Sequence, residues 1–260
     1  MIYIAFLIFT LAIFAFAFYQ WQYFMVFSPT YYRDEELGEG YSALKATTDD
    51  GVELEGALFE PINATKTLLV FVGRSQDAVG LIDKLSKSYP KTRVVVFNYR
   101  SYGKSGGVAN EKNLLSDGLE IAERVQKEYG FFYVLGFSIG SSVAAYVASK
   151  RSVKGVFLVG AFDSIASLAT SKFENWRFGW SVDFSNASRY GFNTFDYVKG
   201  IDSDVYMFVS ESDETACLRN ARNVKTSVKN LAYYRELQNL THKELLWDDE
   251  VVNKINEVVK

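Results

Sequence analysis

The 260-residue sequence contains one cysteine, Cys217, and one histidine, His242. A single cysteine excludes an internal disulfide framework and any zinc site built from several cysteines. A single histidine excludes metal sites made of histidine clusters. Any chemistry that needs a histidine base must therefore use His242, because the chain offers no second candidate.

An excess of charge of one sign is also absent. The chain has 28 Lys and Arg residues against 31 Asp and Glu residues, a formal net charge of −3, with no long run of like charge. Nucleic-acid binders normally carry a basic patch or stripe, so this balance argues against that class. With 48% hydrophobic and 23% charged residues, the chain has the composition of a folded protein, long enough for one large domain with a sizeable core.

No charged residue precedes Arg33, and over residues 2–19 only Thr10 interrupts the apolar sequence. A helix of roughly 20 residues, rising 1.5 Å per residue, spans the ~30 Å hydrocarbon core of a bilayer. Aromatic rings that favour the headgroup region follow at the end of this stretch: Tyr19, Trp21 and Tyr23. The pattern predicts a single-pass N-terminal membrane anchor over residues 1–27.

A cleaved signal peptide is the alternative interpretation, since residues 15–17 (Ala-Phe-Ala) resemble a small-x-small cleavage site. The missing basic n-region and the length of the apolar stretch favour an anchor that is retained. Arg33 is the only basic residue nearby, so the positive-inside bias indicates neither side of the membrane. A polar linker over residues 28–40 and a domain over residues 41–260 are predicted to follow.

Strand and helix patterns alternate from residue 41 onward, which predicts an α/β fold. We expect strands over residues 41–48 and 52–59, joined by a hairpin turn, and over 67–72, 93–98, 131–136, 156–159, 205–209 and 231–235. Helices are expected over residues 78–87, 111–128, 139–149 and 243–259. Asn110 is placed to cap the second of these helices.

Residues 162–201 break the alternation and are rich in aromatic side chains. We interpret them as an insertion of short helices placed over the sheet. Two roles stay open, ordinary packing and a wall that faces substrate, because apolar, aromatic pockets are the common ligand sites. The candidate pocket residues in this insertion are Phe162, Trp176 and Trp180.

A G-x-S-x-G pattern occupies residues 136–140, between a predicted strand and a predicted helix. This is the strand–turn–helix context of a nucleophile elbow, which would expose Ser138 above the sheet at a helix N-terminus. The alternative is a Gly/Ser turn without chemistry. A serine hydroxyl needs a base to remove its proton, and His242 follows the last predicted strand, where such a base is required.

The acid that orients His242 has three candidates after the strand over 205–209. Asp213 is preferred because it lies beyond the strand end, and Glu211 is the second choice. The chain order Ser138, Asp213, His242 is that of a serine–acid–histidine hydrolase and of neither common serine-protease class. For an oxyanion hole we expect the backbone N–H groups of Ile139 and Arg74. For the Arg74 guanidinium we expect a salt bridge to surface acids, with contact to an anionic substrate group as the alternative.

Three sequence blocks, over residues 27–29, 47–54 and 98–106, resemble the α/β-hydrolase superfamily. The resemblance is greatest to its branch of N-terminally membrane-anchored, minimal-lid serine hydrolases, related to prolyl-oligopeptidase-like and acyl-protein thioesterase-like hydrolases. It spans nearly the whole chain, and the third block, Asn-Tyr-Arg-Ser-Tyr-Gly-Lys-Ser-Gly, is the most distinctive. The resemblance implies a mostly parallel sheet with helices on both faces, with nucleophile, acid and base at Ser138, Asp213 and His242.

Two departures from the branch are visible. Residues 72–74 are Val-Gly-Arg where the branch usually has His-Gly-Asn, and residues 209–210 are Val-Ser where it usually has His-Gly. The first change keeps the backbone donor but alters the side chains beside it. The change at residues 209–210 weakens the support that the resemblance gives to Asp213 as the acid.

The sequence thus predicts a membrane-anchored serine hydrolase that cleaves esters or thioesters of apolar acyl groups, with a small-molecule or lipidated substrate. It requires no metal, no cofactor and no nucleic acid. A prolyl-oligopeptidase-like peptidase is the alternative enzyme, ranked lower because the chain lacks a large extra domain. A non-catalytic, membrane-tethered binding protein is the alternative outside enzymes.

Overall fold

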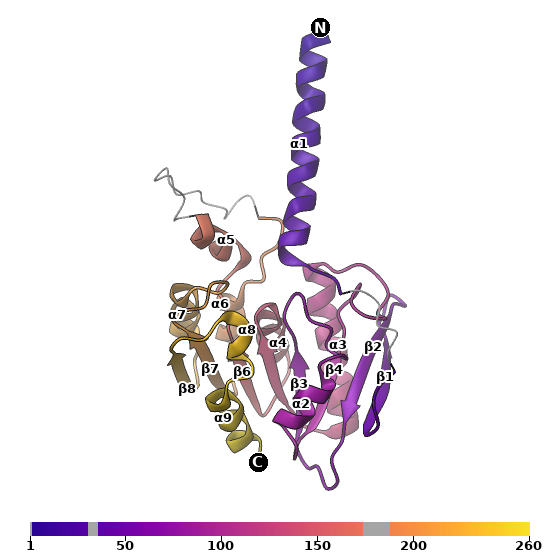
Figure 1. The fold of residues 1–260 in the computed structure, drawn as a ribbon, viewed down its shortest axis with the longest axis vertical. Helices are drawn as coiled ribbons and strands as arrows, with labels where there is room; N and C mark the ends of the chain where they lie inside the picture. Colours follow the sequence, from indigo (N-terminus) through magenta and orange to yellow (C-terminus); the bar gives the residue numbers. More distant parts are fainter. Residues whose placement is uncertain (1, 31–35, 174–187) are drawn as a thin grey trace.

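Parallel strands buried on both faces form the centre of the molecule. The computed structural model describes residues 2–30, 36–173 and 188–260. Within them one sheet has the strand order β1-β2-β4-β3-β5-β6-β7-β8 (Figure 1). The strands are β1 (Tyr41–Thr47), β2 (Glu53–Phe59), β3 (Thr67–Phe71), β4 (Arg93–Phe97), β5 (Tyr133–Phe137), β6 (Gly155–Val159), β7 (Asp204–Ser210) and β8 (Leu231–Leu237). Only the β1/β2 and β2/β4 pairs are antiparallel, so the predicted mostly parallel α/β sheet is confirmed.

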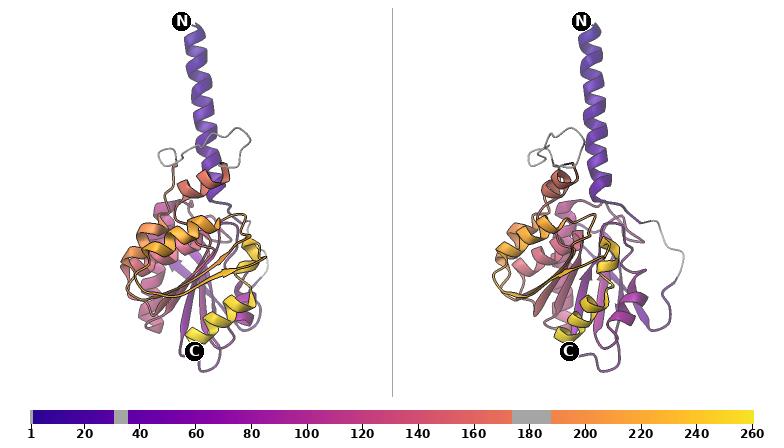
Figure 2. Two further views of the ribbon diagram at one scale, coloured as in Figure 1. Left: turned by 90° about the vertical axis from the view of Figure 1, so that its left-hand side faces the viewer. Right: turned by 60° about the vertical axis from the view of Figure 1, so that its left-hand side comes forward.

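The central strands carry continuous apolar runs because both of their faces are covered. Every residue of β3 and of β6 is buried. The helices of the domain are α2 (Ile82–Ser88), α3 (Glu111–Tyr129), α4 (Ile139–Lys150), α7 (Leu218–Ser227), α8 (His242–Leu245) and α9 (Asp249–Val259). Asn110 caps α3 as expected, its side chain accepting the Asn113 N–H. The helices α3 and α4 pack together on one face, and α2 and α9 lie on the other, where Asn256 donates to the Ser88 carbonyl (Figures 1 and 2).

The prediction of one closing helix over residues 243–259 was wrong. The segment forms two helices, α8 and α9, separated by a turn at residues 246–248. Asp248 begins the second helix, since its carboxylate accepts the N–H groups of Glu250 and Val251 at 2.9 and 3.4 Å. Apolar residues continue through the break, so periodicity alone does not reveal it.

The insertion predicted over residues 162–201 contains short helices, as expected. They are α5 (Ile165–Phe173), α6 (Thr194–Tyr197) and a 3-10 helix, η1 (Val198–Gly200). Asn193 caps α6 by accepting the Asp196 N–H. In all views α5 lies at the end of the domain from which the N-terminal helix projects (Figures 1 and 2).

The N-terminal helix α1 (Ile2–Val26) projects away from the domain, on the side opposite the C-terminus (Figure 1). Its 25 residues are long and apolar enough to cross a membrane, a criterion that signal sequences also meet.

The residues that follow α1 contact the domain. Phe27, directly after the helix, has no exposed surface. Two residues of the predicted linker contact the domain: Ser28 N–H donates to the Tyr102 hydroxyl at 3.0 Å, and Thr30 accepts the Gly103 N–H at 3.1 Å. The boundaries at residues 27 and 40 stay predictions.

A buried arginine holds the loop after β4 to the rest of the domain. Arg100 donates two hydrogen bonds to Asp117 on α3, at 2.8 and 2.7 Å, and two to Asp50 in the β1–β2 turn, at 2.6 and 2.8 Å. Its side chain and that of Asp117 are each 5% exposed. The carboxylates, Asp117 foremost, raise the pKa of Arg100, and Arg100 lowers the pKa of Asp50. The distinctive block over residues 98–106 is therefore held by hydrogen bonds and ion pairs to α3 and to the β1–β2 turn, two segments that are distant from each other in sequence.

We predict that Arg100→Met destabilises the fold by about 3–5 kcal/mol, because it leaves the buried Asp117 carboxylate without its cation. Denaturant unfolding of the full chain in detergent micelles measures the loss. Arg151→Met is the matched control, since Arg151 pairs with Glu123 at the surface and should contribute less than about 1 kcal/mol. Equal losses in the two variants would contradict the structural role of Arg100.

Candidate active site

Ser138 occupies a strained turn between β5 and α4. Its backbone has φ 55° and ψ −122°, a combination that non-glycine residues rarely adopt. The residue before it ends β5 and the residue after it begins α4. This is the geometry of a nucleophile elbow, and it places the Ser138 side chain at the end of the sheet.

The two glycines of the pattern are required by close backbone contacts. A Cβ at Gly136 would overlap the carbonyl oxygen of Gly140, and a Cβ at Gly140 would overlap the carbonyl oxygen of Phe71. Any side chain would force α4 away from β3 and β5. The spacing of the pattern thus follows from how tightly the first turn of α4 lies against the strand ends.

Asp213 and His242 form a buried hydrogen-bonded pair. The distance from Asp213 Oδ2 to His242 Nδ1 is 2.6 Å. The other oxygen, Oδ1, accepts the N–H groups of Thr215 and Ala216 at 2.8 and 2.7 Å. Because both oxygens are bonded, the carboxylate is held with Oδ2 directed at the ring. Glu211, the second candidate, is exposed, and its N–H donates to the Leu237 carbonyl in continuation of the β7–β8 pairing.

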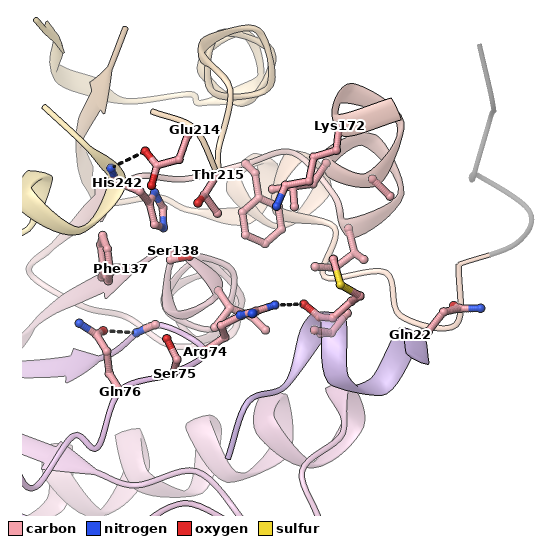
Figure 3. A pocket seen from close by; sticks show the side chains of 18 of the residues that line it. Gln22, Arg74, Ser75, Gln76, Phe137, Ser138, Lys172, Glu214, Thr215 and His242 are labelled. Atoms are coloured by element: carbon pink, nitrogen blue, oxygen red, sulfur yellow. Dashed lines mark hydrogen bonds between the residues drawn. The ribbon is translucent and has the colours of Figure 1, made fainter. Parts of the chain in front are cut away.

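Two contacts of the His242 ring and one of its backbone fix the position of the residue. It stacks on Phe137, with ring centroids 4.9 Å apart, and its Cε1 lies against Gly160, where a Cβ would be only 3.0 Å away. Its backbone N–H donates to Glu214 at 3.1 Å. The Nε2 atom is buried and makes no hydrogen bond within the described residues. His242 and Ser138 line the same pocket, and Figure 3 shows the ring beside the serine.

The turn after β3 faces Ser138 across this pocket. Arg74 lies in it, and Ile139 begins α4, so the Ile139 N–H has no carbonyl partner within its own helix. The structure thus brings together both residues predicted to supply oxyanion donors. The Arg74 guanidinium donates to the Met25 carbonyl at the end of α1, and the predicted salt bridge to surface acids is not found among the described residues (Figure 3).

Two buried tyrosines hold this turn in place. The Tyr99 hydroxyl donates to the Val72 carbonyl at 2.8 Å, and the Tyr102 hydroxyl donates to the Arg74 carbonyl. Burial raises the pKa of both hydroxyls. Gln76 adds a third bond by accepting the Gly73 N–H at 2.6 Å. The backbone of the turn is therefore set by side chains of the block over residues 98–106 and by Gln76.

The pocket over Ser138 has a volume of about 600 Å³, a common size for a small-molecule site. Phe162, one of the three residues predicted for a substrate pocket, lines it. Trp176 and Trp180, the other two predicted pocket residues, lie outside the described residues. Within the described part of the chain, no group of three or more His, Cys, Asp or Glu side chains is placed to hold a metal ion.

Sequence reasoning missed one wall of this pocket. The missed residues all lie on the last turns of α1: Phe18, Trp21, Gln22, Met25 and Val26. No sequence signal distinguishes them, because α1 is apolar on every side and no face stands out. Their contribution depends on how α1 docks on the domain.

No protein-family model matches the sequence, and no curated protein matches it with significance. Among solved structures, an esterase of Pyrococcus furiosus aligns with a TM-score of 0.64 at 16% identity, over 89% of this chain and 96% of the esterase. An alpha-beta hydrolase from Vibrio vulnificus gives 0.69 at 16% identity, over 85% and 81% of the two chains. The esterase domain of a Rhodothermus marinus protein gives 0.61 at 16% identity, over 84% and 95%. At this identity the likeness concerns the course of the backbone, and this chain has the α/β-hydrolase fold.

Proposed function

We propose that this protein is a membrane-anchored serine hydrolase that cleaves carboxylic ester or thioester bonds of apolar acyl substrates. The observation that carries the proposal is the 2.6 Å hydrogen bond between His242 Nδ1 and Asp213, in a pocket that both His242 and Ser138 line, with Nε2 left without a hydrogen bond among the described residues. A histidine held in this way on one nitrogen is ready to act as a base through the other. The structural likeness to two esterases agrees with this chemistry.

In the proposed reaction, His242 Nε2 takes the proton of the Ser138 hydroxyl as Oγ attacks the substrate carbonyl carbon. The negative charge that develops on the carbonyl oxygen is stabilised by the N–H groups of Arg74 and Ile139. Collapse of the tetrahedral intermediate breaks the bond to the alcohol or thiol, which takes the proton from His242 as it leaves. Water then attacks the acyl-enzyme by the same route, releasing the acid and restoring Ser138.

Asp213 acts through His242. Its carboxylate keeps the proton of the neutral ring on Nδ1 and stabilises the imidazolium that forms during each proton transfer.

The proposed anchor is α1, whose length and apolar surface fit a bilayer. About half of the residues that line this pocket are apolar or aromatic, and those on α1 and α5 offer an acyl group a surface to pack against.

We predict that Ser138→Ala abolishes labelling of the full chain by a fluorophosphonate probe and lowers kcat for a p-nitrophenyl ester by about 10⁶-fold. The probe reacts covalently with an activated serine hydroxyl, so loss of that hydroxyl removes the reaction. Ser116→Ala, in α3 and outside the pocket lining, is the control and should label like the wild type. Equal labelling of the wild type and Ser138→Ala would contradict the assignment of Ser138 as the nucleophile.

We predict that Asp213→Asn lowers kcat at neutral pH by about 10⁴-fold, because an amide cannot hold His242 in the required tautomer. Glu211→Gln, in the same loop but exposed, should change kcat by no more than about twofold. Steady-state hydrolysis of one p-nitrophenyl ester by both variants makes the comparison. A larger loss in Glu211→Gln than in Asp213→Asn would assign the acid to Glu211 instead.

A further inference from the structure

The base of α1 is docked firmly on the hydrolase domain. Phe27 is fully buried and packs edge-on against Tyr190, with ring centroids 4.9 Å apart. The Gln22 side chain accepts the Arg189 N–H at 2.8 Å, and the Arg189 guanidinium lies 3.7 Å from the centre of the Tyr19 ring. Together with the bond from Arg74 to the Met25 carbonyl, these contacts fix the direction in which α1 leaves the domain.

The docked part of α1 turns one face toward Ser138. The pocket-lining residues Phe18, Trp21, Gln22, Met25 and Val26 are spaced i, i+3, i+4, i+7 and i+8, which places them on one side of a helix. The opposing wall comes from α5, with Ile165, Leu168, Ala169 and Lys172 at spacings i, i+3, i+4 and i+7. The two helices thus border a slot that is apolar except for Gln22 and Lys172 and that belongs to the same pocket as the candidate nucleophile (Figure 3).

The outer end of this slot lies where a bilayer surface would be. The 25 residues of α1 extend roughly 37 Å at 1.5 Å per residue, more than the ~30 Å of hydrocarbon that about 20 residues span. Counted from Ile2, the hydrocarbon ends near Trp21, among the rings that favour the interface. Phe18 and Trp21 line the pocket, yet about two fifths of each residue's surface stays exposed, so this apolar border faces the lipid.

We infer that the substrate is a long-chain acyl ester resident in the bilayer, which enters from the lipid through the slot between α1 and α5 with its acyl chain against α1. This inference rests on the proposed function and on the insertion of α1. An acyl chain that moves along the slot passes from lipid to an apolar wall without crossing water, so the cost of hydrating each methylene is avoided. The last turns of α1 then determine specificity as well as location.

The route of entry is tested with the full chain reconstituted in vesicles of diether phosphatidylcholine, whose lipids contain no hydrolysable acyl ester. 4-Methylumbelliferyl palmitate is placed either in the protein's own vesicles or in separate protein-free vesicles. The inference predicts an initial rate at least about tenfold higher when ester and protein share a bilayer, because only those chains reach the slot without passing through water. Equal rates from the two populations would overturn it.

The role of the α1 face is tested by Trp21→Ala/Met25→Ala in the same vesicles. We expect the ratio of kcat/KM for the palmitate ester to that for the butyrate ester to fall at least about tenfold, because only the longer chain extends along this wall. Phe24→Ala is the matched control: Phe24 lies on the same turns, does not line the pocket and should leave the ratio unchanged. A ratio unchanged in the double variant would overturn the inference, and a misfolded variant is recognised by loss of fluorophosphonate labelling.

Failure of the inference and failure of the proposed function give different results. If Ser138 labels and the butyrate ester is hydrolysed while palmitate in the shared bilayer is not, the inference falls and the hydrolase proposal stands. If the wild-type chain neither labels nor hydrolyses any ester, both fall together.

Discussion

The arrangement of the site depends on one steric constraint, the contact between the first turn of α4 and the end of β3. Gly140 lies so close to the Phe71 carbonyl that no Cβ fits between them. This contact brings the end of β5, the start of α4 and the turn after β3 into one corner of the sheet. This arrangement forces the backbone of Ser138 into a strained conformation with positive φ, which the surrounding packing maintains. The serine hydroxyl, the Ile139 N–H and the turn that contains Arg74 become neighbours as a result.

The loop after β4 supports this corner from the other side. Several of its polar groups are hydrogen-bonded within the protein: Arg100 binds two carboxylates, Tyr99 and Tyr102 donate to carbonyls of the turn after β3, and the Asn98 side chain accepts the Ala78 N–H at 2.7 Å. Polar groups buried in this way stabilise one backbone conformation because every alternative leaves some of them unpaired. The block that is most distinctive in the sequence therefore supports the site without supplying a reacting group.

The helix α1 and the pocket form one unit. A helix joined by a loose linker would only hold the domain near a membrane, whereas a docked helix also shapes the space over Ser138. Tyr102 illustrates this link, since its hydroxyl donates to the Arg74 carbonyl and accepts the N–H of Ser28, two residues beyond the end of α1. The position of α1 and the backbone of the turn after β3 are thus coupled through one buried side chain.

The sequence by itself determined the alternation of strands and helices, the elbow around Ser138 and the serine–acid–histidine order, because these depend on local periodicity, glycine placement and chain order. It also singled out His242 by leaving no other histidine. Tertiary structure decided which acid meets that histidine, since Asp213 and Glu211 differ in burial and direction and not in residue chemistry. It decided the break between α8 and α9, where a side-chain cap at Asp248 outweighs continuous apolar periodicity. It also decided that α1 lines the pocket, because a helix apolar on every side carries no local signal of the face that it presents to a partner.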